Sequence, residues 1–424
     1  MRENWITCTL GELLTLKNGF AFKSSNYINE GIPVIRIGDI NNWIVDENQA
    51  KCVVENKEYD GYIVEKGDIL IAMSGATTGK FGVYESDSKA YQNQRVGNLK
   101  PSSKDLIDKK YIFNLLYSLK YQIEKDAYGG AQPNISAGKI HALNTVLAPL
   151  PEQRAIVAKI EELFSDLDKG IADLNLAKDQ LKVYRQAVLK KAFEGEYPQK
   201  KIIEIADVNT GATPKRGNSE FWENGTIPWV TSTVVNNDFV NEPSELITEN
   251  AIKQTNCKLI PKGSLLVAMY GEGKTRGKCS ELNIDTATNQ ALAGITLFKE
   301  YKESKQFVKW FFVKNYEEIR LLSSGGVQPN LNLTIIKNTI IPFPEHKQQI
   351  QIAKEIESRL SICDKVEENI TESLEKAKAL RQSILKKAFE GTLLSEEEIA
   401  TCKAAKDYEP ASVLLKKIKA EKKK

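Results

Sequence analysis

Lys190-Lys191-Ala192-Phe193-Glu194-Gly195 occurs a second time in this chain, letter for letter, as Lys386-Lys387-Ala388-Phe389-Glu390-Gly391, which lies 196 positions later. The surrounding sequence repeats at the same offset, in three further pairs of matching stretches: Arg185-Gln186 with Arg381-Gln382, Gly67–Leu70 with Gly263–Leu266, and Gly129–Asn134 with Gly325–Asn330. A period of this size is too long for one unit of a solenoid. The chain is therefore predicted to be one unit of roughly 195 residues written twice, as duplicated domains.

The composition limits the kinds of protein that this chain can be. Its 424 residues leave room for two or three domains with cores of their own. Because the net charge is only +3, any basic surface for nucleic acid must be local and balanced by acidic groups elsewhere. No apolar run is long enough to span a bilayer, and Met1–Asn4 is followed by no signal-peptide core. We therefore expect a cytoplasmic chain.

The cysteines and histidines point to no metal site. The six cysteines are scattered without a C-x-x-C pair, which favours reduced thiols over a disulfide framework. Only two histidines, His141 and His346, accompany them. This small supply of ligands argues against a zinc site.

Residues 1–150 are predicted to form a mixed, strand-rich domain. The short apolar runs Ile32–Ile37 and Asp68–Met73 are bounded by Gly, Asn and Asp, as buried strands are. Tyr111–Lys125 carries apolar residues at helical spacing and is predicted to be one helix. Gly- and Asn-rich loops such as Ser74–Lys80 join these elements.

Residues 151–198 are predicted to form a long helix, because Gly170 is the one glycine and no proline occurs between Glu152 and Phe193. Apolar residues recur there at coiled-coil spacings, namely Ile160, Leu163, Leu167, Leu174, Leu181 and Val188. A helix of ~40 residues is ~60 Å long. A single amphipathic helix of that length cannot bury its apolar stripe alone.

The second half of the chain repeats this order. Residues 199–343 are predicted to form a second mixed domain with a short helix at Lys309–Leu322, and residues 344–394 a second long helix. The expected seam of that helix is Ile356, Cys363, Val366, Ile370, Ala377, Leu380 and Ile384. It can bury this seam only by running back antiparallel along the first helix. The predicted fold is α+β, with two mixed α/β domains at the ends of a rod of two long antiparallel helices, a coiled coil with a pseudo-twofold internal repeat.

Residues 395–424 depart from the repeat and are predicted to form a C-terminal tail helix. Val413, Leu414, Leu415 and Ile418 give this tail a short apolar stripe. Two placements are open: the tail packs at the end of the rod near domain one, or it contacts a partner subunit.

With these features, the chain resembles the specificity subunit of Type I restriction-modification enzymes. The resemblance rests on the helix openings Pro149–Gln153 and Pro342–His346, on the two Lys-Lys-Ala-Phe-Glu-Gly closings and on Glu409–Leu415, and it covers essentially the whole chain. It implies that the mixed domains are target recognition domains, each reading one half of a bipartite asymmetric DNA sequence. The helices would hold the two half-sites at a fixed spacing.

The resemblance also implies which partners supply the chemistry. The long helices would dock two methyltransferase (modification) subunits, and motor-nuclease (restriction) subunits would join that core. S-adenosylmethionine, ATP and Mg would be bound by these partners, so this chain would be non-catalytic and hold no cofactor. The residues agree, because the sequence has no G-x-x-x-x-G-K-[ST] and no G-x-G-x-x-G after a strand. Gly75–Lys80 has the wrong spacing for a phosphate loop.

The predicted DNA contacts are Gly-rich loops that carry Lys, Arg, Asn or Gln, because phosphates need cations and base edges need paired donors and acceptors. Domain one has three such clusters: Lys17, Asn18 and Lys23; Thr77, Thr78 and Lys80; Gln92, Asn93, Gln94 and Arg95. Domain two has three at homologous places: Thr213, Lys215 and Arg216; Lys274, Thr275, Arg276 and Lys278; Thr288, Asn289 and Gln290. For any single residue among them, a solvated loop side chain is an equally open interpretation.

Other tempting residues are assigned to the scaffold. Met73 and Met269 end apolar strands at equivalent positions and are expected in the core. Trp222 and Trp229 could stack on DNA, but packing behind the recognition surface is preferred. Two tripeptides that follow paired glycines are interpreted as structural turns rather than DNA contacts: Gln132-Pro133-Asn134 and Gln328-Pro329-Asn330.

Two other functions are alternatives to that of a DNA-specificity subunit. The chain could be the reading half of a fused methyltransferase-nuclease, but it contains no methyl-donor motif. It could be a coiled-coil spacer without DNA function, but a spacer has no reason to diversify only its loops. DNA binding that weakens steeply with salt would separate the specificity-subunit hypothesis from the spacer hypothesis, because a spacer would not bind DNA at all.

Overall fold

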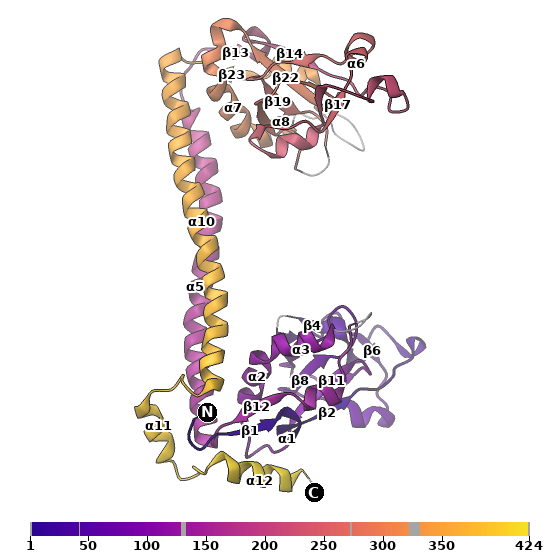
Figure 1. Ribbon diagram of the computed structural model, residues 1–424, viewed down its shortest axis with the longest axis vertical. Coiled ribbons are helices and arrows are strands. Elements are labelled where there is room, and N and C mark those ends of the chain that lie inside the picture. Colours follow the sequence, from indigo (N-terminus) through magenta and orange to yellow (C-terminus); the bar gives the residue numbers. More distant parts are fainter. Residues whose placement is uncertain (1, 42, 129–132, 272–273, 322–330, 423–424) are drawn as a thin grey trace. The chain divides into compact units, whose positions relative to one another are not determined.

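The computed structural model describes residues 2–41, 43–128, 133–271, 274–321 and 331–422 (Figure 1). The chain divides into two compact units: unit 1 is Met1–Asp173 with Ser373–Lys424, and unit 2 is Leu174–Glu372. Each unit therefore holds one mixed domain together with part of each long helix.

The mixed domain of unit 1 contains two sheets and a strand pair (Figure 1). The smaller sheet has the order β6-β3-β10-β7, and its strands are β3 (Ile32–Ile35), β6 (Lys51–Val53), β7 (Ile63–Val64) and β10 (Ala90–Gln92). The larger sheet has the order β2-β11-β8-β9-β5-β4, and its strands are β2 (Leu14–Asn18), β4 (Ile40–Asn41), β5 (Trp43–Val45), β8 (Ile69–Ala72), β9 (Phe81–Val83) and β11 (Val96–Pro101). The separate pair is β1 (Ile6–Thr9) with β12 (Asn144–Leu147). The strands predicted at 32–37 and 68–73 are confirmed as β3 and β8.

The mixed domain of unit 2 repeats this plan. Its smaller sheet has the order β17-β15-β21-β18, formed by β15 (Ile227–Val230), β17 (Glu245–Ile247), β18 (Leu259–Ile260) and β21 (Thr286–Thr288). Its larger sheet has the order β14-β22-β19-β20-β16, formed by β14 (Ala206–Thr210), β16 (Phe239–Val240), β19 (Leu265–Ala268), β20 (Cys279–Leu282) and β22 (Leu292–Leu297). The separate pair is β13 (Gln199–Lys201) with β23 (Ile340–Pro342).

The duplication extends to strand register. In domain one β3 pairs in parallel with β10, and Ile35 faces Gln92. In domain two β15 pairs in parallel with β21, and Val230 faces Thr288. Since Thr288 lies 196 positions after Gln92, the repeat seen in the sequence is also a repeat of hydrogen-bonded geometry.

The apolar runs that predicted buried strands are covered on both faces. In β8, Ile69 and Ile71 pack with the helices of domain one, whereas Leu70 and Ala72 pack with the core shared with the smaller sheet. A strand covered on both faces loses the usual alternation of apolar and polar residues. Met73 and Met269 are 7% and 2% exposed, which confirms their expected place in the core.

The short helices differ from the prediction in both domains. Domain one has α1 (Leu10–Leu13), α2 (Lys109–Ser118), α3 (Lys120–Ala127) and α4 (Ala137–His141). Domain two has α6 (Glu249–Gln254), α7 (Lys305–Lys314), α8 (Tyr316–Leu321) and α9 (Leu333–Asn338). The single helices predicted at 111–125 and 309–322 are each broken, at Leu119 and at Asn315. Both breaks lie near ψ 0°, and the helical spacing of apolar residues continues across them, so the pattern gave no sign of the interruption.

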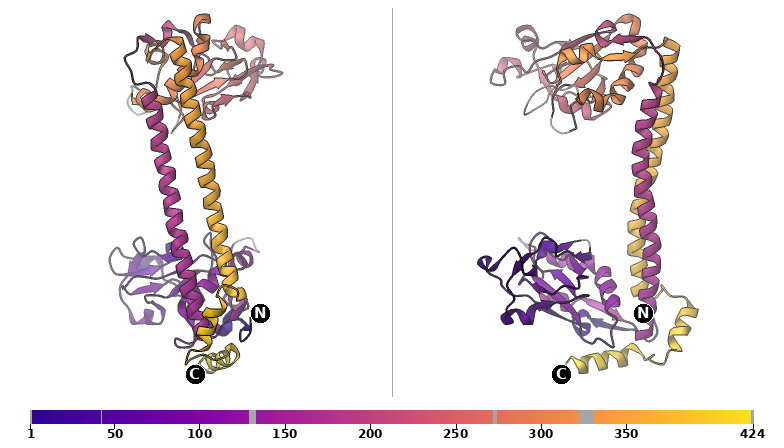
Figure 2. Two further views of the ribbon diagram at one scale, coloured as in Figure 1. Left: turned by 90° about the vertical axis from the view of Figure 1, so that its left-hand side faces the viewer. Right: turned by 180° about the vertical axis from the view of Figure 1, so that it is seen from behind.

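The two long helices, α5 (Leu150–Ala192) and α10 (His346–Glu390), run antiparallel within each unit (Figure 2). In unit 1 the α5 residue Asp168 forms an ion pair with Arg381 of α10. In unit 2 Arg185 of α5 lies 2.7 Å from a carboxylate oxygen of Asp364. Early residues of α5 thus meet late residues of α10, and late residues of α5 meet early ones.

The predicted seam of α10 needs two corrections. Val366 is 40% exposed and Leu380 is 51% exposed, so neither is buried against α5. Leu360, which was not included in the seam, is 9% exposed and packs with Val188 and Ile356. An apolar position on a helix is visible in the sequence, but the side of the helix that its partner covers is not.

The tail forms two helices, α11 (Glu396–Lys403) and α12 (Ala411–Glu421), rather than the single helix predicted. Leu414 and Ile418 of α12 are 1% and 0% exposed and belong to the core of domain one with Leu10 and Leu13 of α1. The first of the two open placements, packing near domain one, is therefore the one observed.

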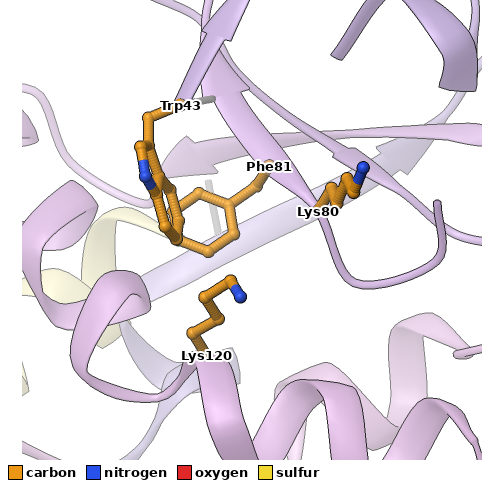
Figure 3. A pocket seen from close by; sticks show the side chains of 4 residues that line it. All are labelled: Trp43, Lys80, Phe81 and Lys120. Carbon is orange, nitrogen blue, oxygen red and sulfur yellow. The ribbon is translucent and has the colours of Figure 1, made fainter. Parts of the chain in front are cut away.

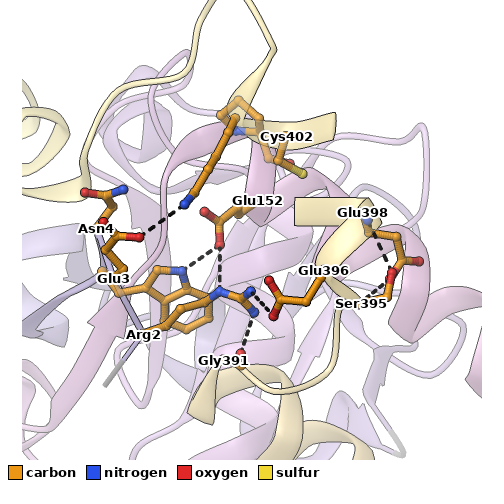
Figure 4. Close-up of polar contacts among 12 residues, drawn as sticks. Arg2, Glu3, Asn4, Glu152, Gly391, Ser395, Glu396, Glu398 and Cys402 are labelled. Atoms are coloured by element: carbon orange, nitrogen blue, oxygen red, sulfur yellow. Dashed lines mark hydrogen bonds and ion pairs between the residues drawn. The ribbon is translucent and has the colours of Figure 1, made fainter. Parts of the chain in front are cut away.

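A buried carboxylate joins several segments of unit 1 (Figure 4). Glu152, at the start of α5, is 1% exposed. It accepts a 2.7 Å hydrogen bond from Trp5 Nε1 and lies 3.9 Å from Arg2 Nε. Arg2 also donates a 2.6 Å hydrogen bond to the Gly391 carbonyl, where α10 has ended. The N-terminal segment is thus tied to one end of each long helix.

Glu152→Gln is expected to lower the free energy of unfolding of unit 1 by about 1 kcal/mol, because a neutral amide accepts a weaker hydrogen bond from Trp5 and no longer attracts Arg2. Urea unfolding of the full chain measures this change. Glu161→Gln, on the same helix as Glu152, is the control: it breaks an exposed pair with Lys110 of α2 and should change stability by less than about 0.5 kcal/mol. Equal losses in the two variants would contradict the role given to Glu152.

Among the described residues, no helix combines the length and apolarity that crossing a membrane requires.

Candidate nucleic-acid interface

The three predicted loop clusters of domain one meet at the turn between β10 and β11. Phe20, which follows β2, donates a 2.8 Å backbone hydrogen bond to the Gln92 carbonyl, and its own carbonyl accepts one of 2.8 Å from Gln94. On the other side of the turn, Met73 donates a 2.9 Å backbone hydrogen bond to the Arg95 carbonyl, just before the loop Ser74–Lys80. Loops that are far apart in the sequence therefore form one continuous edge of the domain.

Domain two builds the same edge with different side chains. Thr213 Oγ1 donates a 2.9 Å hydrogen bond to Gln290 Oε1, which joins the loop after β14 to the turn after β21. Met269 donates a 2.7 Å backbone hydrogen bond to the Ala291 carbonyl. The structure thus brings the three clusters together in each domain, as the homologous placement predicted.

Two glycines that were not among the predicted site residues, Gly19 and Gly211, allow the loop after the first strand to approach the β10–β11 turn and its counterpart in domain two. A Cβ on Gly19 would lie 2.2 Å from the carbonyl oxygen of Gln92, and one on Gly211 would lie 1.8 Å from that of Thr288. Both glycines come directly after the first strand of the larger sheet. Because any side chain would collide with backbone there, glycine is required. The signal in the sequence was a glycine directly after a polar strand end, Asn18 or Thr210.

Three predicted contacts are corrected by their burial, and one of them is Thr288 of domain two, which is 0% exposed. Gln92 is 1% exposed, and its Nε2 donates to the carbonyls of Lys17 at 2.7 Å and Val96 at 2.6 Å. Thr78 is 2% exposed, and its hydroxyl donates a 2.6 Å hydrogen bond to the Gly75 carbonyl. Gln92 and Thr78 hold the loops in place, and none of the three side chains offers an atom to a ligand at the surface. An amide or hydroxyl has the same letter in the sequence whether its partner is internal or external.

Asn93 and Asn289 perform one task in both domains. The side-chain oxygen of Asn93 accepts a 3.2 Å hydrogen bond from the backbone N–H of Arg95, and that of Asn289 accepts one of 3.1 Å from Ala291. An asparagine that bonds the backbone two residues on stabilises a tight turn. We therefore assign both side chains to the turn rather than to base recognition.

The remaining predicted residues of domain one are accessible to different degrees. Lys23, Lys80, Gln94 and Arg95 are exposed, and their side chains form no hydrogen bond or ion pair with another residue in the described part of the chain. Asn18 is also exposed. Lys17 donates a 2.5 Å hydrogen bond to the Gly61 carbonyl, and the Thr77 hydroxyl donates one of 3.0 Å to the Ile37 carbonyl. Domain one thus presents exposed cations and amides around the β10–β11 turn.

In domain two the Arg216 side chain is held by several contacts. Its guanidinium makes a forked pair with Glu245 at 2.5 and 2.7 Å and stacks over Trp222 at 4.0 Å. The hydrogen bond from Arg216 lowers the pKa of Glu245, so this carboxylate stays ionised at neutral pH. Trp229 is 1% exposed and packs edge-on against Trp222. The expectation of packing behind the surface is confirmed for Trp229, whereas Trp222 is half-buried and lies under the Arg216 guanidinium.

The other predicted residues of domain two surround the same edge. Lys215, Lys274 and Gln290 are exposed, and Thr275 and Arg276 are half-buried. Lys278 donates a 2.9 Å hydrogen bond to Asn236 Oδ1.

Of the two tripeptides that follow paired glycines, the structure describes Pro133 and Asn134. In domain one the Pro133 carbonyl accepts backbone and side-chain hydrogen bonds from Gly75 and Thr78, and Asn134 bridges Ser74. This confirms a structural turn back to the larger sheet. Gln132 and the whole of Gln328–Asn330 lie outside the described residues.

The exposed side chains at these edges are compatible with a polyanionic ligand. Their exposed groups are ammonium, guanidinium and amide groups, which suit phosphate oxygens and base edges. Within the described ranges, no group of three or more His, Cys, Asp or Glu side chains could hold a metal ion.

A duplicated mixed domain with such an edge, attached to long helices, defines a class of DNA-specificity proteins. The family model described as the Type I restriction modification DNA specificity domain matches this chain twice, over residues 2–175 and 194–376. The chain belongs to this family, as its motifs led us to expect.

Individual relatives and solved structures agree with this assignment. The chain is 25% identical over 461 residues to the Type I restriction enzyme EcoBI specificity subunit of Escherichia coli, covering 99% of this chain and 93% of that protein. A structure reported for complex assembly and conformational transition of the type I R-M system aligns with a TM-score of 0.73 at 16% identity, over 92% of this chain and 99% of that one. The HsdS subunit from Thermoanaerobacter tengcongensis aligns with a TM-score of 0.61 at 15% identity, over 93% and 98%. At these identities the structures establish a shared fold.

Proposed function

We propose that this chain is the DNA-recognition subunit of a Type I restriction-modification complex, in which each target recognition domain reads one half of a bipartite asymmetric site. The observation that carries the proposal is one scaffold, repeated in register, with different side chains at the same edge, so that an exposed cation in one domain has no cationic counterpart in the other. At the turn, Arg95 of domain one stands where domain two has Ala291, and on the neighbouring strand Lys17 stands where domain two has Asn209. Because the scaffold is shared and the edge is not, the two half-sites should differ in sequence.

We further propose that the long helices dock two methyltransferase subunits and that motor-nuclease subunits join the complex. Support comes from apolar side chains that the helices leave exposed: Leu176, Val183, Ile362 and Leu380 are each more than half exposed. Apolar side chains that gather on one exposed face indicate a site for a protein partner, and Leu176 and Val183, seven positions apart on α5, share a face of that helix. In this proposal S-adenosylmethionine, ATP and Mg belong to the partners, this chain is non-catalytic, and the complex works in the cytoplasm.

Deleting the gene for this chain is expected to remove adenine methylation from one two-part motif with a fixed gap, because the methyltransferase then lacks its sequence reader. Modified-base sequencing of the host genome with and without the chain measures this loss. Replacing residues 1–150 with the equivalent domain of a relative is the matched variant, and it should change one half-motif and keep the other. If methylation is unchanged in cells that express the chain and a partner methyltransferase, the proposal is wrong.

A further inference from the structure

A cavity of about 280 Å³ adjoins the loop Ser74–Lys80 of domain one. It is lined by Trp43, Lys80, Phe81 and Lys120 (Figure 3). Trp43 begins β5 and Phe81 begins β9. Lys80 directly precedes β9, and Lys120 is the first residue of α3, next to the helix break at Leu119. Of these residues the loop pattern singled out Lys80 alone, because Trp43 and Lys120 lie far from the Gly-rich loops in the sequence.

The walls of this cavity are aromatic and cationic. The ring of Trp43 lies 4.8 Å from that of Phe81 and 4.0 Å from that of Tyr117, and Lys120 Nζ lies 5.6 Å from the indole. Trp43 has a φ of +72°, a left-handed conformation that is strained for a bulky residue. Strain of this kind persists where the surroundings hold it, and it gathers at ligand sites.

Domain two has a cavity at the equivalent position. Strand register makes Cys279 the counterpart of Phe81, since each faces the third residue of the neighbouring strand, Val267 or Ile71. The second cavity, of about 340 Å³, is lined by Cys279 together with Lys274, Lys278 and Asp238. The fold therefore makes a lysine-lined recess twice, and the other lining residues differ between the domains.

The positive charge of the first cavity is available to a ligand. Lys80 is exposed and forms no hydrogen bond or ion pair with another residue that the structure describes. Lys120 is paired with Glu124 at 2.6 Å, but this is a half-exposed pair one helical turn apart, and such pairs contribute little to stability. An incoming anion can therefore take the place of Glu124 at low cost.

We propose that this cavity seats one backbone phosphate of the DNA strand that domain one reads, with Lys80 and Lys120 holding the phosphate and Trp43 packing against the sugar. The inference rests on the proposed function. A base would have to leave the duplex to enter the cavity, whereas phosphates lie on the outside of every duplex. Contacts of this kind set the register of a protein on DNA without carrying sequence information. The cavity would thus position the exposed Gln94 and Arg95 over the correct base pairs.

The test is the binding of a synthetic duplex that carries the mapped motif, using the full chain and its Lys120→Gln variant. The variant should bind about fivefold more weakly, and it should do so equally on a scrambled duplex, because a phosphate contact is independent of sequence. The slope of log Kd against log salt should fall by about 0.9, the value for one lost phosphate contact on B-DNA. Lys125→Gln, an exposed lysine on the same helix, is the control and should match the parent chain.

A second measurement locates the phosphate. Duplexes in which one phosphate at a time is replaced by a neutral methylphosphonate should show a position that weakens binding by the parent chain and not by Lys120→Gln. Unchanged affinity and salt slope in the variant would overturn the proposal, and so would a loss confined to the motif duplex. If the parent chain assembled with its partner methyltransferase binds neither duplex, the proposed function itself fails, which distinguishes the two outcomes.

Discussion

Arg95→Ala is expected to weaken binding of the motif duplex about tenfold to a hundredfold, and to do so through the half-site that domain one reads. Arg95 is exposed at the β10–β11 turn, its backbone is fixed by the Met73 N–H at 2.9 Å, and its side chain has no hydrogen-bond or ion-pair partner among the described residues. A free guanidinium on a fixed turn suits bidentate contact with guanine. Equilibrium binding of duplexes that carry one intact and one scrambled half-site measures the effect for each domain separately.

The control for this variant is Lys104→Ala, which removes an exposed cation elsewhere in domain one. It should leave the affinity within about twofold, because a distant surface charge is screened at physiological salt. A loss of equal size on a duplex in which the first half-site is scrambled would show that Arg95 contacts a phosphate rather than a base. No loss on any duplex would remove Arg95 from the interface.

Ile418→Ala is expected to lower the free energy of unfolding of unit 1 by about 2–5 kcal/mol, the cost of emptying a fully buried aliphatic site. Ile418 is 0% exposed and lies in the core of domain one with Leu10 and Leu13. Calorimetry of the full chain should show that the transition assigned to unit 1 moves to lower temperature. The transition of unit 2 should keep its midpoint, because its core contains no residue of the tail.

Val413→Ala is the matched control, since Val413 lies on the same helix and is 40% exposed. It should change the stability of unit 1 by less than about 0.5 kcal/mol. If Ile418→Ala were as mild as this control, α12 would be an appendage rather than part of the domain-one core. That result would reopen the second placement of the tail, against a partner subunit.

The duplication also separates scaffold from recognition within a single chain. Asn93 and Asn289 make the same turn bond, and Gly19 and Gly211 make the same close approach. Where both domains use a residue for the same internal contact, that residue builds the loop. Positions where an exposed side chain of one domain has a different counterpart in the other, such as the exposed Arg95 against the buried Ala291, are the ones left to distinguish two half-sites.

The sequence alone was enough for the plan of the molecule. The repeat at 196 positions predicted two copies of one domain, and the apolar runs predicted the strands β3 and β8. The stretch without proline predicted α5, the repeated order of the chain predicted α10, and the apolar stripes predicted that the helices pair. These features depend on periodicity and on exact recurrence, which are properties of the order of residues.

Only the tertiary structure decided which polar side chains are free. The sequence predicted Gln92 and Thr78 to be DNA contacts, but both side chains are buried. Each donates hydrogen bonds to backbone carbonyls of this chain instead. No sequence pattern predicted that Trp43 and Lys120 belong to a site, yet they line one cavity with Lys80. The same limit applies to Val366 and Leu380, whose exposure depends on where the partner helix lies. A residue type states what a side chain can bond, whereas the partner it meets is set by segments that the fold brings together from far along the chain.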